Sequence, residues 1–264
     1  MHNNKITIMT IRHGETEFNR QKRYAGLLDV PLNAKGIRDC QMASGFFVDS
    51  VDLVITSKLK RSIQTARIFA NNHKSIIESE LCNERNFGTM QGHTSQEVEF
   101  IKPEIKYIKI AGDFHSLNPP QGERFSALYK RAKEFHKFLR FLLSEHRCLR
   151  ILVVSHEVFL QQFHGVLRGE SWRESMRHSL PNLTLTIFTL QGNYLLSESS
   201  RKLISERQES WHTVPAPQSS GAVCRTADIT RRPRKQFWFQ ERNQNVKVQD
   251  HSTNIQEKVF QRDI

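Results

Sequence analysis

The stretch that decides the fold is Ile6-Thr7-Ile8-Met9-Thr10-Ile11, followed directly by Arg12-His13-Gly14-Glu15-Thr16. Its first six residues are β-branched and mostly apolar, which predicts a buried strand that ends in a glycine-containing turn. Open α/β sheets bind their ligands beyond the carboxyl ends of their strands. Arg12 and His13 are therefore candidate ligand-binding residues.

Two later segments repeat this pattern of an apolar run that ends in polar residues. The run Leu53-Val54-Ile55-Thr56 predicts a strand, and Ser57 is a candidate cap for the next helix, whose first turns contain Arg61. The run Leu152-Val153-Val154-Ser155 predicts another buried strand, which leads into His156. Two arginines and two histidines thus lie at strand ends or helix starts.

Four segments, taken in order, resemble the signatures of the histidine phosphatase superfamily, which is also called the phosphoglycerate mutase-like family. They are Arg12-His13-Gly14, Ser57 to Ala66 around Arg61, Leu81 to Gly88 around Glu84, and Ser155-His156. The resemblance covers about residues 5–200. It implies a three-layer α/β/α sandwich with a mostly parallel central sheet.

The resemblance also implies a phosphatase, and the chemistry of these residue types explains how it would work. Neutral His13 can attack phosphorus and form a phosphohistidine. Arg12 and Arg61 can bind the phosphate oxygens bidentately, and His156, if protonated, adds another donor. Glu84 is the candidate general acid for the leaving oxygen. We expect no metal or cofactor, because the arginines supply the electrostatic stabilisation.

Three further residues are candidates for phosphate binding. Asn19 could add a neutral hydrogen-bond donor, and Gly26 is a further candidate for phosphate binding. Glu123, which lies in Pro119-Pro120-Gln121-Gly122-Glu123-Arg124, is the rival for the role of acid. Many family members have Gly-Glu followed by Ser or Thr there, whereas Arg124 takes that position in this chain. Glu123 could equally be an acidic residue at a helix N-terminus.

The expected substrate is a small phosphorylated metabolite such as a sugar phosphate. A cofactor-dependent phosphoglycerate mutase is the first alternative, because Asn83-Glu84-Arg85 and Met90-Gln91-Gly92 resemble mutase segments. Mutases hold the substrate carboxylate with paired arginines, however, and residues 93–118 contain no arginine. The second alternative is a catalytically silent member of the family that acts as a binding protein.

Composition sets limits on the environment of the protein. The 264 residues suffice for one α/β domain, and no apolar run is long enough to span a bilayer. Met1-His2-Asn3-Asn4 leads straight into a strand, so we expect no secretory leader. The four cysteines lack metal-type spacing, which favours reduced thiols in a cytoplasmic protein. The formal charge of +12 suits a phosphorylated substrate.

The predicted catalytic domain is 1–200. Hydrophobic periodicity predicts helices over Ala34–Phe47, Lys60–Asn71, Phe125–Glu145 and Val158–Leu167, and a hairpin over residues 183–196. Residues 89–122 lack a clean period, and the resemblance implies that they form a lid-like insertion that shapes substrate choice.

Residues 201–264 have few aliphatic side chains and are rich in polar ones, which predicts a disordered tail. The tail carries 12 Lys or Arg residues against 7 Asp or Glu residues, and so holds +5 of the formal charge of +12. Arg231-Arg232-Pro233-Arg234-Lys235, followed by Phe237-Trp238-Phe239, is a candidate nuclear-import signal or a contact for an anionic partner. A solvated run of charge is the simpler interpretation.

Overall fold

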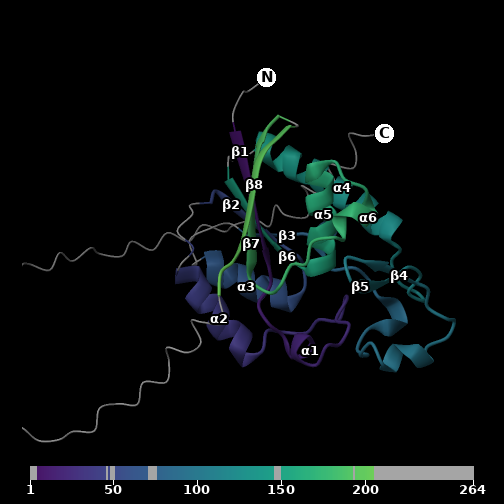
Figure 1. The fold of residues 1–264 in the computed structure, drawn as a ribbon. Coiled ribbons are helices and arrows are strands. Elements are labelled where there is room, and N and C mark those ends of the chain that lie inside the picture. Colours follow the sequence, from purple (N-terminus) through teal and green to yellow (C-terminus); the bar gives the residue numbers. More distant parts are fainter. Residues whose placement is uncertain are drawn as a thin grey trace, which may run out of the picture.

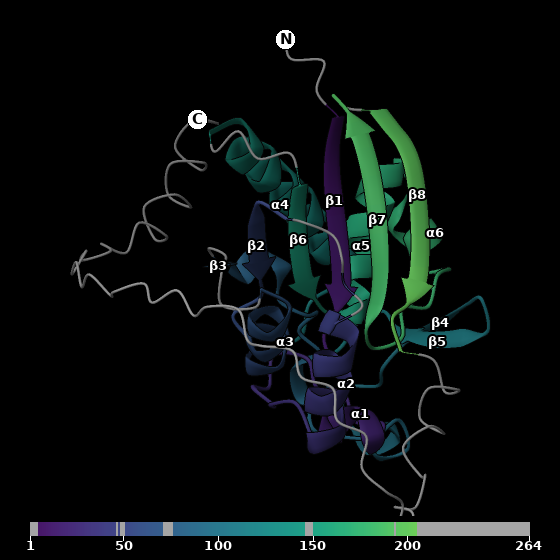
Figure 2. The same ribbon diagram turned by 90° about the vertical axis from the view of Figure 1, so that its left-hand side faces the viewer.

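The computed structural model describes residues 5–45, 47, 51–70, 76–145, 150–192 and 194–204. The strands of its main sheet lie side by side in the order β3-β2-β6-β1-β7-β8 (Figure 2). Their bounds are β1 Lys5–Arg12, β2 Leu53–Thr56, β3 Ile76–Glu78, β6 Arg150–Ser155, β7 Thr184–Gln191 and β8 Tyr194–Lys202. The pairs β1–β6, β2–β6 and β2–β3 are parallel, whereas β7 runs antiparallel to β1 and β8. The prediction of a mostly parallel sheet is confirmed.

Helices cover both faces of this sheet, with α2 and α3 on one side and α4, α5 and α6 on the other (Figure 1). The helices are α1 Glu17–Arg20, α2 Ala34–Gly45, α3 Lys60–Ala70, α4 Phe125–Glu145, α5 Glu157–Arg168 and α6 Trp172–Ser175. Single 3-10 turns lie at Glu80–Cys82, Gly88–Met90 and Glu97–Phe100. The predicted three-layer sandwich is therefore confirmed. None of the helices in the described ranges combines the length and apolarity needed to cross a bilayer.

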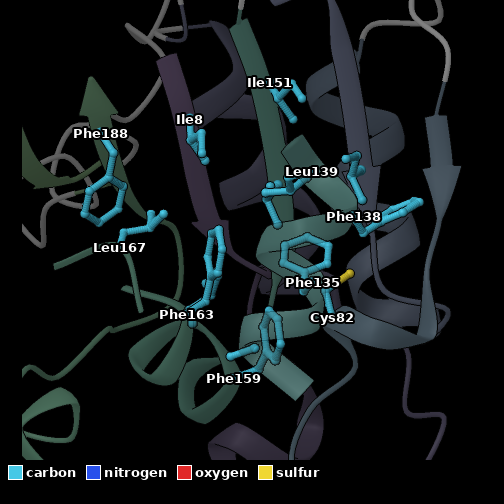
Figure 3. Close-up of a cluster of buried hydrophobic side chains, with 14 of the residues drawn as sticks. Ile8, Cys82, Phe135, Phe138, Leu139, Ile151, Phe159, Phe163, Leu167 and Phe188 are labelled. Atoms are coloured by element: carbon cyan, nitrogen blue, oxygen red, sulfur yellow. The ribbon is translucent and has the colours of Figure 1, made fainter. Parts of the chain in front are cut away.

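The sheet has a separate apolar core on each face, because successive side chains of a strand point to opposite sides. In β1, Ile8 packs with α4 and α5, whereas Met9 packs with α2 and α3. Figure 3 shows the first of these cores, where phenylalanine rings of α4 and α5 meet under Ile8 and Ile151. The predicted apolar stripe of α4 is buried in this core, with Phe125, Leu128, Ala132, Phe135, Leu139 and Leu142.

The region predicted as a lid folds partly into a two-stranded hairpin, β4 Tyr107–Ile110 and β5 Asp113–Ser116. Arg85 ties this hairpin to the main domain. Its Nη2 donates to the carbonyl of Ser116 at 2.8 Å, and its Nε donates to the carbonyl of Glu123 at 2.8 Å. The lid role itself remains a prediction.

The fold continues past residue 200, because β8 pairs with β7 as far as Lys202. Leu203 and Ile204 are then buried in the core under α2 and α3, and the Leu203 N–H donates to the carbonyl of Leu183 at 3.1 Å. Helix α2 ends at Gly45, before its predicted end at Phe47, and α3 is described as far as Ala70. The predictions for the tail, including Arg231 to Phe239, lie outside the described residues.

Candidate active site

The two predicted histidines lie side by side because their strands are neighbours. Strands β1 and β6 pair in parallel up to Arg12 opposite Ser155, and the His13 N–H donates to the carbonyl of Ser155 at 3.0 Å. The next residue on each strand is a histidine, and the ring centroids of His13 and His156 are 5.0 Å apart. The carboxyl edge of the sheet thus brings together two residues that are far apart in sequence.

The imidazole of His13 is buried and held by its own loop. Its Nδ1 lies 2.6 Å from the carbonyl of Gly14, which can only accept, so Nδ1 carries the proton. Burial lowers the pKa of His13 well below its usual value, and the charges of Arg61 and Arg12 lower it further. The ring is therefore neutral at physiological pH and has a free electron pair on Nε2.

Arg61 is buried in the first turn of α3 and reaches three acceptors. Its Nη2 donates to the carbonyl of Gly26 at 2.7 Å, its Nη1 to that of Leu28 at 2.8 Å, and its Nε to Nδ1 of His156 at 3.2 Å. Burial lowers the pKa of Arg61 to about 10, so it remains a cation at neutral pH. Gly26 has a φ of +52°, which favours glycine, and it contributes its carbonyl to holding Arg61.

His156 is neutral in this arrangement. Its Nδ1 accepts from Arg61, so Nε2 carries the proton and donates to the Ser57 hydroxyl at 2.7 Å. Burial lowers the pKa of His156 well below its usual value, as do the charges of Arg61 and His13. Ser57 also accepts from the N–H of Leu59 at 3.3 Å, just before α3 begins. The ring therefore orients Arg61, and the conditional prediction of a charged His156 does not describe this state.

Arg12 lies at the end of β1 and is shared between two partners. Its Nη1 donates to the carbonyl of Leu180 at 2.7 Å and forms an ion pair with the carboxylate of Glu157 at 2.6 Å. Its Nε is buried and has no hydrogen-bond partner among the described residues. Glu157 was not identified from the sequence, although it directly follows His156.

The buried carboxylate of Glu84 lies at the N-terminus of α5. It accepts from the N–H groups of Arg85 at 2.8 Å, Phe159 at 3.1 Å and Val158 at 3.4 Å. Burial raises its pKa, which outweighs the opposite effects of the Arg85 N–H, Arg61 and Arg12. Glu84 thus holds a proton at higher pH than an ordinary glutamate, as a general acid requires.

Glu123, the rival acid, is bound to an arginine that the sequence analysis missed. Its two oxygens accept from Nε and Nη2 of Arg131 at 3.0 and 2.7 Å. Arg131 also donates to the carbonyls of Leu81, Asn83 and Glu84, at 3.0, 2.7 and 3.2 Å. We call this group the Arg131 clamp. Glu123 is thereby tied to the backbone of the loop that carries Glu84.

Asn19 lies in the short helix α1 and forms a capping box with Thr16, which caps the start of this helix. Its side-chain oxygen accepts from the N–H and the hydroxyl of Thr16, at 3.0 and 2.9 Å. Any phosphate contact must therefore come from the amide nitrogen, and that contact remains a prediction. In the described part of the chain, no three His, Cys, Asp or Glu side chains are grouped so as to hold a metal ion.

The comparison with protein families decides the identity of the chain. Residues 8–200 match the model of the histidine phosphatase superfamily, branch 1. This chain belongs to the histidine phosphatase superfamily. The match includes every predicted site residue from Arg12 to His156, and the chain is a phosphatase of this family, as predicted.

Similar proteins carry the names of phosphatases and of a mutase-like protein. The chain is 31% identical to phosphoglycerate mutase-like protein 4 of Arabidopsis thaliana, over 69% of this chain and 79% of that protein. It is 28% identical to phosphoserine phosphatase 1 of Hydrogenobacter thermophilus, over 62% of this chain and 77% of that protein. A solved structure of a putative α-ribazole-5'-P phosphatase from Escherichia coli matches with a TM-score of 0.63 at 25% identity. The match covers 76% of this chain and 97% of that one.

Proposed function

We propose that this histidine phosphatase hydrolyses phosphomonoesters of small metabolites, such as sugar phosphates, through a phosphohistidine on His13. One observation carries the proposal: the hydrogen bond from Nδ1 of His13 to the Gly14 carbonyl, which leaves Nε2 as a neutral nucleophile. Neutrality matters because a protonated ring has no electron pair with which to attack phosphorus.

The first half-reaction transfers the phosphoryl group to the protein. Nε2 of His13 forms a bond to phosphorus as the bond from phosphorus to the ester oxygen breaks. Arg12 and Arg61 stabilise the charge on the equatorial oxygens. Glu84 gives its proton to the departing alcohol oxygen and becomes a carboxylate.

The second half-reaction releases phosphate. The Glu84 carboxylate takes a proton from water as the water oxygen attacks phosphorus, and the bond to Nε2 breaks. Glu84 then holds its proton again, and His13 is free. In the alternative mutase reaction, a phosphoglycerate hydroxyl would take the place of water.

The nucleophile is tested by rapid acid and alkaline quench with a radiolabelled phosphomonoester. We expect base-stable, acid-labile phosphate on the protein, and we expect His13→Ala to lose both this label and turnover. The matched control is His93→Ala, because the side chain of His93 is half exposed in the lid. Full turnover in His13→Ala would refute the mechanism, and turnover that depends on 2,3-bisphosphoglycerate would favour the mutase.

The identity of the general acid is tested by comparing substrates with different leaving groups. Glu84→Gln should slow hydrolysis of alkyl phosphates by about 10²–10⁴-fold. It should slow the first step with p-nitrophenyl phosphate much less, because that leaving group hardly needs a proton. If Glu123→Gln shows this selective effect and Glu84→Gln does not, Glu123 is the acid.

A further inference from the structure

Glu157 places a negative charge on the solvent side of the phosphate site. It is the first residue of α5, directly after His156, and its carboxylate forms the ion pair with Arg12. The Glu157 side chain is 29% exposed and that of Arg12 is 13% exposed, whereas His13 and His156 are buried. A phosphate bound by Arg12 therefore lies close to the Glu157 carboxylate, and so does the alcohol part attached to that phosphate.

The charge of Glu157 acts both on the site and on the hairpin. It raises the pKa of Glu84 in the site, and it raises that of His115 on the hairpin strand β5. Burial lowers the pKa of His115 overall, so this ring is neutral near pH 7, and its buried Nε2 has no partner among the described residues. His115 therefore supplies no positive charge to offset Glu157.

The nearby arginines are already engaged. Arg61 is held by two carbonyls and His156 and must also bind the transferred phosphate, whereas Arg85 donates to the carbonyls of Ser116 and Glu123. Arg12 is the cation that Glu157 already neutralises, and it must also bind the transferred phosphate. A second anion on the substrate would thus meet the Glu157 carboxylate, and none of these three described arginines is left to bind it.

We infer that Glu157 selects phosphomonoesters whose alcohol part is uncharged or cationic, such as polyol or amino-alcohol phosphates, and rejects those with a carboxylate beside the ester. This inference rests on the proposed function and narrows its substrate class. Like charges a few ångströms apart, partly exposed to water, give about tenfold discrimination.

The test uses two pairs of esters that differ by one carboxylate. Glycerol 3-phosphate is compared with 3-phosphoglycerate, and phosphoethanolamine with phosphoserine. We expect the protein to prefer the first member of each pair by about tenfold in kcat/KM. Glu157→Gln should bring the preference close to one, whereas Glu157→Asp should retain most of it.

The matched control is Glu198→Gln, which removes the same charge from strand β8, where Glu198 forms an ion pair with Arg168. It should leave both preferences unchanged. The preference is also measured without turnover, as the ratio of dissociation constants in a His13→Ala background with and without Glu157→Gln. Absence of hydrolysis with an intact binding preference would refute the proposed function and support selection by Glu157. A ratio that Glu157→Gln changes by less than twofold would refute the inference.

Discussion

Replacing Arg131 by methionine should destabilise the protein and shift the loop that carries Glu84. The Arg131 clamp joins one guanidinium to both oxygens of Glu123 and to three carbonyls of the loop around Glu84. The Arg131 and Glu123 side chains are only 20% and 16% exposed. Methionine keeps much of the apolar length of the side chain but leaves Glu123 and the three carbonyls without their donor.

The magnitude follows from this geometry. Removing one partner of a buried ion pair costs about 3–5 kcal/mol. The loss is a large part of the stability of a typical domain, which is about 5–15 kcal/mol. Arg131→Lys should lose less of the free energy of unfolding, because an ammonium keeps the charge. It cannot, however, reach all the acceptors that the planar guanidinium binds.

The assay is urea unfolding, followed by circular dichroism, with Lys130→Met as the control. Lys130 is the exposed neighbour on α4, so its replacement should change the free energy of unfolding by less than about 0.5 kcal/mol. A double-mutant cycle with Glu123→Gln isolates the ion pair from the bonds to the carbonyls. A loss below about 1 kcal/mol in Arg131→Met would refute the reasoning.

Two further predictions concern stability. Burial lowers the pKa of His164 to about 3, so between about pH 6.5 and 3 the unfolded chain binds a proton that the folded chain does not, and the free energy of unfolding falls as the pH falls. His164→Gln should reduce this slope by up to about 1.4 kcal/mol per pH unit, measured by urea unfolding at several pH values; an unchanged slope would contradict the assignment. Removing Leu203 and Ile204 from a chain that ends at residue 204 should cost about 3–6 kcal/mol, because each buried side chain contributes about 1.5–3 kcal/mol. Thermal melting of the two chains measures this loss, and equal melting temperatures would show that Leu203 and Ile204, which follow β8, do not support the core.

The parts of the fold that were predicted correctly are those with one strong local pattern. The run before Arg12 is apolar at every second position or more, and α4 repeats its apolar residues at helical spacing. The hairpin β4–β5 lacked such a signal because large apolar side chains on it, such as Phe114, are exposed. Leu203 and Ile204 were assigned to the tail because two apolar residues in a polar stretch form no period.

The candidate site also has residues that a local sequence pattern predicts and residues that it does not. Motifs at strand ends and helix starts predicted that Arg12, His13, Arg61 and His156 lie together, and they do because the topology of a parallel sheet brings such ends together. Arg131 could not be found in this manner, since nothing local distinguishes an arginine that clamps a distant loop from a solvated one on α4. For Glu157 a signal existed, because a carboxylate beside a site histidine affects the charge of the site, but its pairing with Arg12 depends on three-dimensional distance.

The strand order has a consequence for folding during synthesis on the ribosome. Strand β1 lies between β6 and β7, and β6 begins only at Arg150. At about 5–20 residues per second, β1 waits on the order of ten seconds for its first neighbour to be synthesised. During that time β1, whose side chains are mostly apolar and β-branched, has unpaired backbone groups that can pair with strands of other chains. Strand β1, which leads into His13, is thus the strand of the sheet that waits longest for a neighbour, and during that time it can pair with other newly made chains.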